Sequence, residues 1–415
     1  MAIQSNQPAQ RADISVRRAA SRLKHYSSIA AGALGLTRGR APGGPLHAQI
    51  GISDPCNHRC VMCWDHPPED RESAATTDRF GGEREGIMSL ERFAEIIDDL
   101  HTLGTRRIDI VGRGEPLLNA HVVDMVAYAK KCDMLVTMTS NGSRLTGDRA
   151  EAFVELGLDR LKISTNAGTP ENYPNVHVTE TAGNFLKLKQ NLRYLTDARS
   201  AAQRSAPHLT LSFVVSSKNC FEVREMVEVA ADVGADEASF VHTVVHDGTP
   251  DLALSRDQYS DLIAGLPRAK ERARELGVRT NLATLAATVP TYLSEKIDGP
   301  PVVPCYVGWY FTVVLGNGSV MPCCQCSEPI DRVTADRRFL DIWSSDGYTE
   351  FRSAARQLPK ENDILKSCEC DRCMLRPRNI SIHNTLHPWN RIEGGEEDQL
   401  FTITDLLRMK KVDRE

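Results

Sequence analysis

Short apolar, β-branched runs alternate with longer amphipathic segments between about residues 46 and 246. The short runs predict strands, and apolar residues at every third or fourth position predict helices. Ser89 is a suitable N-cap for the first helix, because an apolar face begins directly after it. The strands are expected at 46–52, 107–112, 134–140, 160–165, 209–216 and 237–244. The helices are expected near 89–103, 119–131, 145–157, 181–197 and 219–233.

This alternation predicts an α/β fold. Strand–helix–strand units of this length form parallel sheets with right-handed crossovers. Six such units make a partial (β/α)6 TIM-like barrel, in which functional groups gather at the C-terminal ends of the strands. The loop that follows the first strand is therefore expected at the functional end of the sheet.

The pattern changes after the barrel. A helix is expected at 255–276, followed by a proline-rich stretch. Two apolar runs, 309–315 and 320–323, flank the sequence Gly-Asn-Gly-Ser, which predicts a β-hairpin. A further helix is expected at 339–358, so this region is predicted to be a small α+β domain. The expected divisions are an N-terminal extension at 1–45, the barrel at 46–250, a helical linker at 251–301, the small domain at 302–378 and a tail at 379–415.

Composition is typical of a soluble globular protein. The 415 residues are 41% apolar and 25% charged, with 50 basic and 55 acidic side chains. No global charge indicates a nucleic-acid or membrane partner, and no apolar run approaches the ~20 residues of a membrane span. Residues 1–45 carry seven basic side chains and one acidic one, which suits a transit peptide or a surface helix at about 14–36. The surface helix and a cytoplasmic location are favoured. The long polar stretch 65–87 suits a lid.

Twelve cysteines in such a chain indicate a reducing compartment and metal binding rather than a disulfide framework. Cys56, Cys60 and Cys63 follow the first strand, and seven others lie between 305 and 373. Three thiolates on one loop can hold three corners of a cubic iron–sulfur cluster, which leaves one iron open. The alternative is a zinc site completed by His58 or His66.

The Cys-x3-Cys-x2-Cys spacing after a first strand resembles the radical S-adenosylmethionine (radical SAM) superfamily. The resemblance covers about residues 46–246 and implies a [4Fe–4S] cluster whose open iron binds the amino and carboxylate groups of SAM. Met62 stands where the family usually has an aromatic residue, so it is expected to pack on adenine. Gly112, Gly114 and Glu115 are similar to the motif that binds the SAM amino group, although Arg113 separates the two glycines.

Polar residues at two further strand ends complete the expected SAM site. By the same resemblance, Asn141, Ser164 and Asn166 meet the ribose and carboxylate of SAM. For Asn141, an ordinary Asn-Gly turn is an equal alternative. The polar residues at 216–219 and 242–247 suit either a polar substrate or solvent.

A second group of cysteines lies in the small domain. The hairpin is expected to bring Cys305 near Cys323, and Cys370-x2-Cys373 is a two-ligand loop, so four thiolates complete a closed zinc or [4Fe–4S] site. Its position after such a barrel makes it similar to the twitch domain, a shortened SPASM domain, which implies one auxiliary [4Fe–4S] cluster. Two clusters, as in a full SPASM domain, are the minority interpretation. With a single cluster, Cys324, Cys326 and Cys368 are left over as cysteines that are not ligands.

The resemblance implies reductive cleavage of SAM to a 5′-deoxyadenosyl radical that takes hydrogen from a substrate. The auxiliary cluster can then accept an electron, giving dehydrogenation, or a thiol can return hydrogen, giving epimerisation. Cys220 and Cys326 are the candidate catalytic thiols, with Cys324 and Cys368 as alternatives. A flavodoxin or ferredoxin is the expected electron donor.

The sequence leaves three hypotheses about function open. A small polar carbohydrate or aminocyclitol is the expected substrate. Radical modification of a peptide or protein, of the ribosomal-peptide or sulfatase-maturase type, is the alternative. A non-catalytic iron–sulfur or zinc protein that senses redox state is a third hypothesis, but it leaves Glu115, Ser164 and Asn166 without a role.

Overall fold

A computed structural model describes residues 41–66, 68, 86–245, 248–286, 301–360, 363–370, 373 and 375–392. The helix expected at 14–36 and most of the stretch 65–87 lie outside these residues. Within the described part of the chain, no helix is both long and apolar enough to cross a membrane.

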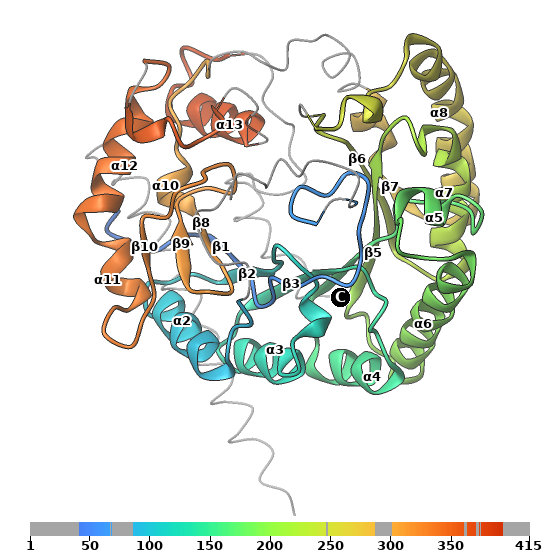
Figure 1. The fold of residues 1–415 in the computed structure, drawn as a ribbon, viewed down its shortest axis with the longest axis horizontal. Helices are drawn as coiled ribbons and strands as arrows, with labels where there is room; N and C mark the ends of the chain where they lie inside the picture. Colours follow the sequence, from blue (N-terminus) through green and yellow to red (C-terminus); the bar gives the residue numbers. More distant parts are fainter. Residues whose placement is uncertain are drawn as a thin grey trace, which may run out of the picture.

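The six predicted strands are confirmed, each within two residues at either end. They pair in parallel and in sequence order, and β7 (Arg279–Thr280) adds a seventh parallel strand beside β6. This sheet curves into a partial barrel (Figure 1). The six are β1 (His47–Ile50), β2 (Arg107–Ile110), β3 (Leu135–Ser140), β4 (Arg160–Ser164), β5 (His208–Val215) and β6 (Glu237–His242).

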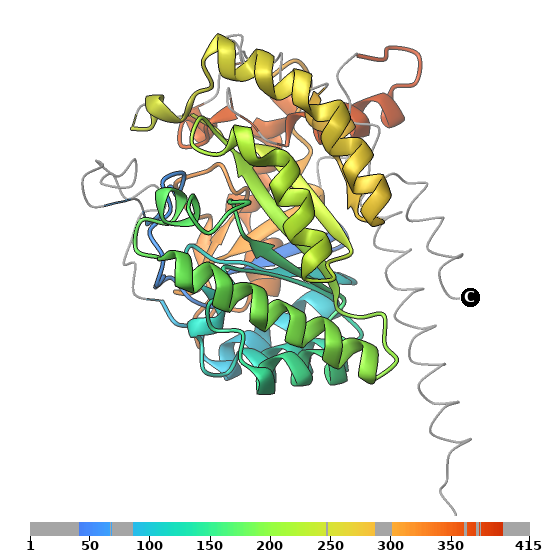
Figure 2. The same cartoon turned by 90° about the vertical axis from the view of Figure 1, so that its right-hand side faces the viewer.

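Amphipathic helices cover the outer face of the curved sheet (Figure 1), and in the turned view of Figure 2 the green and yellow helices lie in front of its strands. Ser89 caps the first of them, because its side chain accepts a hydrogen bond from the Arg92 N–H at 3.2 Å. The helices are α2 (Leu90–Thr102), α3 (Val122–Lys131), α4 (Gly147–Leu156), α6 (Ala182–Ala201), α7 (Val223–Asp232) and α8 (Arg256–Leu276). A four-residue helix, α5 (Tyr173–Val176), follows β4.

The predicted hairpin is confirmed as β8 (Phe311–Val314) and β9 (Ser319–Met321). It does not form a sheet of its own. β8 pairs in parallel with β1, with Phe311 opposite His47, and β10 (Asp331–Arg332) pairs with β9. One ten-stranded sheet therefore runs through both the barrel and the C-terminal region.

One helix and one strand predicted for this region need correction. The helix expected at 339–358 is two helices, α11 (Phe339–Trp343) and α12 (Asp346–Gln357), because Ser345 caps a new helix by accepting from the Tyr348 N–H at 3.4 Å. The strand expected from residue 309 begins at Phe311, after a short helix, α10 (Val307–Tyr310). A further helix, α13 (Arg376–Leu386), was not expected and crosses the predicted start of the tail.

The C-terminal region is tied to the first helix of the barrel. Asp99 on α2 is 3% exposed and accepts hydrogen bonds from Arg338 Nε and from the Leu340 N–H, both at 3.3 Å. Trp343 donates from its indole N–H to the Gly43 carbonyl at 2.8 Å. The bonds to Asp99 fix the start of α11 against α2, and the Trp343 bond fixes its end against the segment before β1, since a buried donor or acceptor is costly to leave unpaired.

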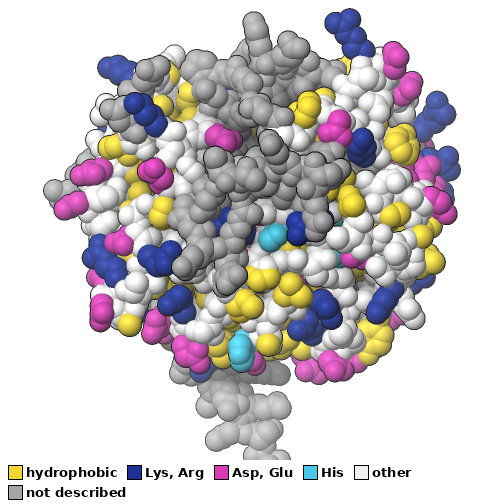
Figure 3. Space-filling model, in the orientation of Figure 1, with side chains coloured by type: hydrophobic (Ala, Val, Ile, Leu, Met, Phe, Trp, Pro, Cys, Tyr) yellow, Lys and Arg dark blue, Asp and Glu magenta, His cyan; other side chains and the backbone are white. Residues whose placement is uncertain are grey.

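Charges of both signs are mixed around the rim of the face shown in Figure 3. The chain as a whole has a formal charge of −5. This face therefore has no extended basic patch among the residues that the structure describes.

A charged cluster at the N-terminal ends of the strands makes stability depend on pH. Hydrogen bonds to Asp236 and Glu237 raise the pKa of His208, while Arg160 nearby opposes the shift. The imidazolium therefore adds stability below its unfolded pKa of about 6.5, and this contribution is lost as the pH rises through the folded pKa. We expect His208→Asn to lower the free energy of unfolding by about 0.5 kcal/mol near pH 6, since the cluster is partly solvated.

The measurement is chemical unfolding of both proteins from pH 6 to pH 9. The difference between wild type and variant should shrink across this range. A difference that grows with pH would contradict the assignment.

Candidate functional site

The three-cysteine loop follows β1 and is held by the segment after β4. Cys60 forms an antiparallel bridge with His177, flanked by hydrogen bonds from the Val61 N–H to the Val176 carbonyl and from the Val178 N–H to the Arg59 carbonyl, both at 2.9 Å. The loop is therefore fixed by main-chain pairing and does not depend on its own turns alone. No pattern in the sequence indicated this contact.

The surroundings of the three thiols suit metal-bound thiolates. Burial, followed by the charges of Cys63 and Cys56, raises the pKa of Cys60 well above its ordinary value, and burial raises the pKa of Cys63 to about 11. The sulfur atoms of Cys56 and Cys63 also accept backbone N–H groups, at 3.4 and 3.2 Å. Three desolvated sulfurs on one loop, two of which accept amide N–H groups, are a donor set that a cationic iron centre would stabilise.

Two buried imidazoles lie against this loop. His177 Nδ1 is 3.0 Å from the Cys60 sulfur, and its Nε2 is 2.9 Å from the Thr165 carbonyl. Because a carbonyl only accepts, the proton of neutral His177 is assigned to Nε2. The His58 ring lies edge-on to His177 at 5.5 Å. Burial lowers the pKa of His58 to about 3 and that of His177 to about 4, so both rings are neutral.

The zinc alternative finds a partial ligand set here. Ligand atoms of His58, Cys60 and His177 lie within 4.8 Å of one another. His66, the other candidate, instead places Nε2 2.8 Å from the Asp54 carbonyl. The two imidazoles could therefore share a metal ion with Cys60 only, whereas the predicted cubic cluster would bind all three thiols.

Glu115 lies in the segment that follows β2, and its carboxylate is held by several hydrogen bonds. It is 2% exposed, and its carboxylate accepts from the Leu117 N–H at 2.9 Å, the Ser140 hydroxyl at 2.7 Å and the Asn141 N–H at 2.7 Å. Burial raises its pKa, while these donors lower it. A carboxylate has about four acceptor positions, so one is left for a further donor.

The structure explains why the glycines around Arg113 are needed. A Cβ on Gly114 would lie 2.0 Å from the Pro55 carbonyl oxygen, and one on Gly112 would lie 2.8 Å from the Ser53 oxygen. Both glycines therefore let strand two approach the start of the cysteine loop. Arg113 is accommodated because its Nε pairs with Asp65 at 3.1 Å, two residues beyond Cys63. This Arg113–Asp65 pair was not anticipated from the sequence.

The remaining predicted SAM contacts lie at these strand ends, and their roles stay predictions. Asn141 donates from Nδ2 to Asn57 in the cysteine loop at 3.0 Å. Asn166 has a φ of 54°, and its side-chain oxygen accepts from the Val214 N–H at 2.9 Å, which joins β4 to β5. Ser164 is half-buried at the end of β4, and Met62 packs beside Val61.

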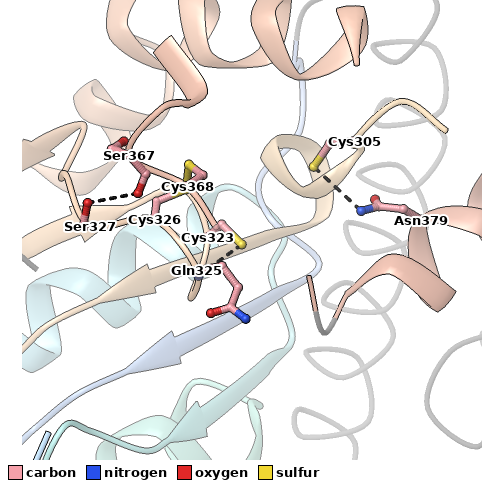
Figure 4. Close-up of a disulfide and its surroundings, with 8 residues drawn as sticks. All are labelled: Cys305, Cys323, Gln325, Cys326, Ser327, Ser367, Cys368 and Asn379. Atoms are coloured by element: carbon pink, nitrogen blue, oxygen red, sulfur yellow. Dashed lines mark hydrogen bonds between the residues drawn. A yellow bond between two sulfur atoms is a disulfide. The ribbon is translucent and has the colours of Figure 1, made fainter. Parts of the chain in front are cut away.

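The structure places the two candidate catalytic thiols in very different settings. Cys220 is 4% exposed and lies within the main hydrophobic core, and burial raises its pKa. Cys326 is bonded to Cys368 in a disulfide (Figure 4). In this form Cys326 has no S–H to donate, so the expectation that the extra cysteines are free thiols is wrong for this pair. Cys324 remains a thiol.

Three of the four predicted auxiliary ligands lie around one cavity, and their ligand role stays a prediction. Cys305, Cys370 and Cys373 line one cavity. A hydrogen bond to Cys324, burial, and the charges of Cys305 and Cys373 together raise the pKa of Cys323. The sulfur of Cys323 also accepts from the Gln325 N–H at 3.5 Å (Figure 4). Three thiols around one cavity, with Cys323 close enough to feel the charges of two of them, fit a closed iron–sulfur or zinc site.

Comparison with known proteins agrees with this geometry. Residues 50–202 match the radical SAM superfamily, and residues 305–374 match SPASM, an iron–sulfur cluster-binding domain. A GTP 3′,8-cyclase of Limosilactobacillus fermentum is 34% identical over 160 residues, which are 35% of this chain. The chain spans only 45% of that relative's length.

Two further relatives are matched over longer stretches. A tungsten-containing aldehyde ferredoxin oxidoreductase cofactor-modifying protein of Pyrococcus furiosus is 24% identical over 76% of this chain and 84% of its own length. A PqqA peptide cyclase of Streptomyces rochei is 26% identical over 69% of this chain and 77% of its own length.

Among solved structures, SuiB of Streptococcus suis bound to S-adenosylmethionine shares the fold. Its TM-score is 0.54 at 16% identity, covering 95% of this chain and 84% of SuiB. With the two family matches and the two cysteine groups, the chain belongs to the radical SAM superfamily and carries a C-terminal SPASM-type iron–sulfur domain.

Proposed function

We propose that this radical SAM enzyme takes a hydrogen atom from its substrate and completes a two-electron oxidation, with the auxiliary site as electron acceptor. The observation that carries the proposal is the presence of two separate clusters of cysteines, in segments connected to one continuous sheet. The first has three thiols, which leaves an iron open to an outside ligand. The second has four available, which suits electron transfer rather than SAM binding.

The residues of the first site have distinct proposed roles. When bound, the open cluster and SAM supply a 5′-deoxyadenosyl radical that removes hydrogen from an unactivated carbon. Cys56, Cys60 and Cys63 are the proposed cluster ligands, and Glu115 offers its remaining acceptor position to the SAM ammonium. Because three donors already fix this carboxylate, its orientation is set before SAM binds. A reduced flavodoxin or ferredoxin is the proposed electron donor.

A peptide or protein is the proposed substrate. A pocket borders the cysteine loop at Val61, and its rim carries Phe221 and Val178, which are 68% and 51% exposed. Exposed apolar side chains beside a functional loop suit an apolar side chain of a peptide better than a sugar. The likeness to a PqqA peptide cyclase, and to SuiB, which is also known bound to a precursor peptide, supports this choice.

A carbohydrate or aminocyclitol is the second candidate. The same pocket also presents Asn172, Asn175, Ser217 and Lys218, which can bind hydroxyl groups. Oxidation and epimerisation remain distinct outcomes for either substrate class, because only oxidation removes two hydrogens.

The cysteine variants test the two-site proposal. Anaerobically reconstituted protein should hold about eight irons and form 5′-deoxyadenosine with SAM and dithionite. Cys56→Ala should abolish 5′-deoxyadenosine, whereas Cys305→Ala should keep it and lose about four irons. Cys132→Ala, at the C-terminal end of α3 and outside both cysteine groups, is the matched control and should change neither value. A Cys56→Ala protein that still cleaves SAM would rule out the first site.

The substrate class is tested by product mass. We expect peptides encoded beside the gene to raise 5′-deoxyadenosine formation above the uncoupled rate and to lose two hydrogens. A panel of aminocyclitols and sugars is the parallel assay. Stimulation by this panel alone would overturn the peptide proposal. Unchanged mass with deuterium uptake from D2O would replace oxidation with epimerisation.

Glu115 is tested by the dissociation constant of SAM. In Glu115→Gln the amide NH2 must face one of three donors, so we expect a loss of about 1–3 kcal/mol of stability. Loss of the charged acceptor should also raise the SAM dissociation constant at least tenfold, about 1.4 kcal/mol.

Asp99→Asn is the matched control, because Asp99 is also buried and accepts a backbone N–H, but on the outer helix α2. This variant should lose stability and bind SAM normally. Equal SAM affinity in both variants would contradict the role of Glu115.

A further inference from the structure

The helix α13 reaches into the auxiliary site through Asn379. This side chain is 5% exposed, and its amide nitrogen points toward the Cys305 sulfur (Figure 4). Its oxygen accepts from the Tyr306 N–H at 2.9 Å, and its Nδ2 lies 3.8 Å from the Cys305 sulfur. The sequence had placed Asn379 at the start of the tail, outside the small domain.

The orientation of this amide follows from its partners. A backbone N–H can only donate, so the oxygen of Asn379 must face Tyr306. The NH2 group is then directed at the sulfur, where it can only donate. The contact is therefore an N–H···S hydrogen bond whose direction is fixed by the fold, and the flipped amide would set two donors against each other.

Positive charge from the same helix surrounds the thiols. Arg376 lines the cavity together with Cys305, Cys370 and Cys373. The Arg378 guanidinium lies over the ring of Tyr310 at 5.2 Å. Tyr310 is itself buried among these cysteines, and its hydroxyl has no hydrogen-bond partner among the described residues. The first turn of α13 thus brings one amide donor and two cations to one side of the site.

We infer that Asn379 is a positioning residue of the auxiliary site, which donates a hydrogen bond to the Cys305 thiolate and raises the reduction potential of the centre that it binds. The inference rests on the proposed ligand role of Cys305. A donor to a ligand sulfur stabilises the more negative, reduced state of the centre, so the centre accepts an electron more readily. Asn379 would thereby favour the oxidising outcome of the reaction.

Asn379→Asp keeps the acceptor for the Tyr306 N–H but exchanges the donor to sulfur for a charged oxygen, so Asn379→Leu, which removes the donor without adding charge, is measured beside it and should lower the potential in the same direction. The measurement is a redox titration of the reconstituted protein, followed by electron paramagnetic resonance, with an iron count. We expect wild-type iron and a reduced-to-oxidised ratio of the auxiliary centre at least tenfold lower at fixed potential. Tenfold corresponds to 59 mV for a one-electron couple. The signal of the SAM cluster should titrate as in wild type.

Asn384→Asp is the matched control on the same helix, because its side chain bonds to the main chain of Ile392 instead of to a cysteine. It should leave both potentials unchanged. An unchanged auxiliary potential in Asn379→Asp with full iron would overturn the inference. If Asn379→Asp loses auxiliary iron, the melting temperature of the iron-free variant decides the outcome. A melting temperature equal to that of iron-free wild type supports the inference. A lower one shows a merely structural role and overturns the inference.

The test is separable from the proposed function. If Cys305→Ala keeps its full iron, Cys305 is not a ligand and the proposed auxiliary site fails, whatever Asn379 does. The potential is measured without substrate, so an error in the proposed substrate class does not affect it.

Discussion

The parallel pairing of β8 with β1 is the constraint on which the two thiol sites depend. β1 is hydrogen-bonded on both edges, to β2 and to β8, and the Gly51 N–H continues the pairing to the Val314 carbonyl at 2.7 Å. A strand held on both sides cannot shift without breaking two ladders. The cysteine loop therefore starts from one of the most rigid positions in the sheet, as a site that holds a cofactor requires.

Most of the barrel was predictable from the sequence because its strands alternate buried and half-buried positions and its helices are amphipathic. The β8–β1 pairing was not, because a four-residue strand that is buried throughout has no alternation to set its partner or register. The break in the helix expected at 339–358 depends on Ser345, whose capping bond competes with helix continuation. His177 and Asn379 were missed for a related reason, since they meet Cys60 and Cys305 across 117 and 74 residues.

The cysteines illustrate the same limit. The spacing of Cys56, Cys60 and Cys63 was enough to predict them as one ligand set, because the three residues lie within a single loop. The pairing of Cys326 with Cys368 depends on main-chain contacts between two distant segments, including the Glu369 N–H donating to the Gln325 carbonyl at 2.9 Å. Such contacts form only when the region of the β8–β9 hairpin packs against the segment that contains Cys368. No local sequence pattern therefore specifies this pairing.

The continuous sheet also restricts how an extended chain could be recognised. Within the described residues, the strand order ends on β7 and β10, and each of these edge strands has only two residues. Edges this short give an incoming segment too few free N–H and C=O groups for strand addition. A linear partner must therefore be selected by its side chains, through loops and pockets around the barrel mouth. Selectivity would then reside in a few anchor positions of the partner and tolerate variation between them.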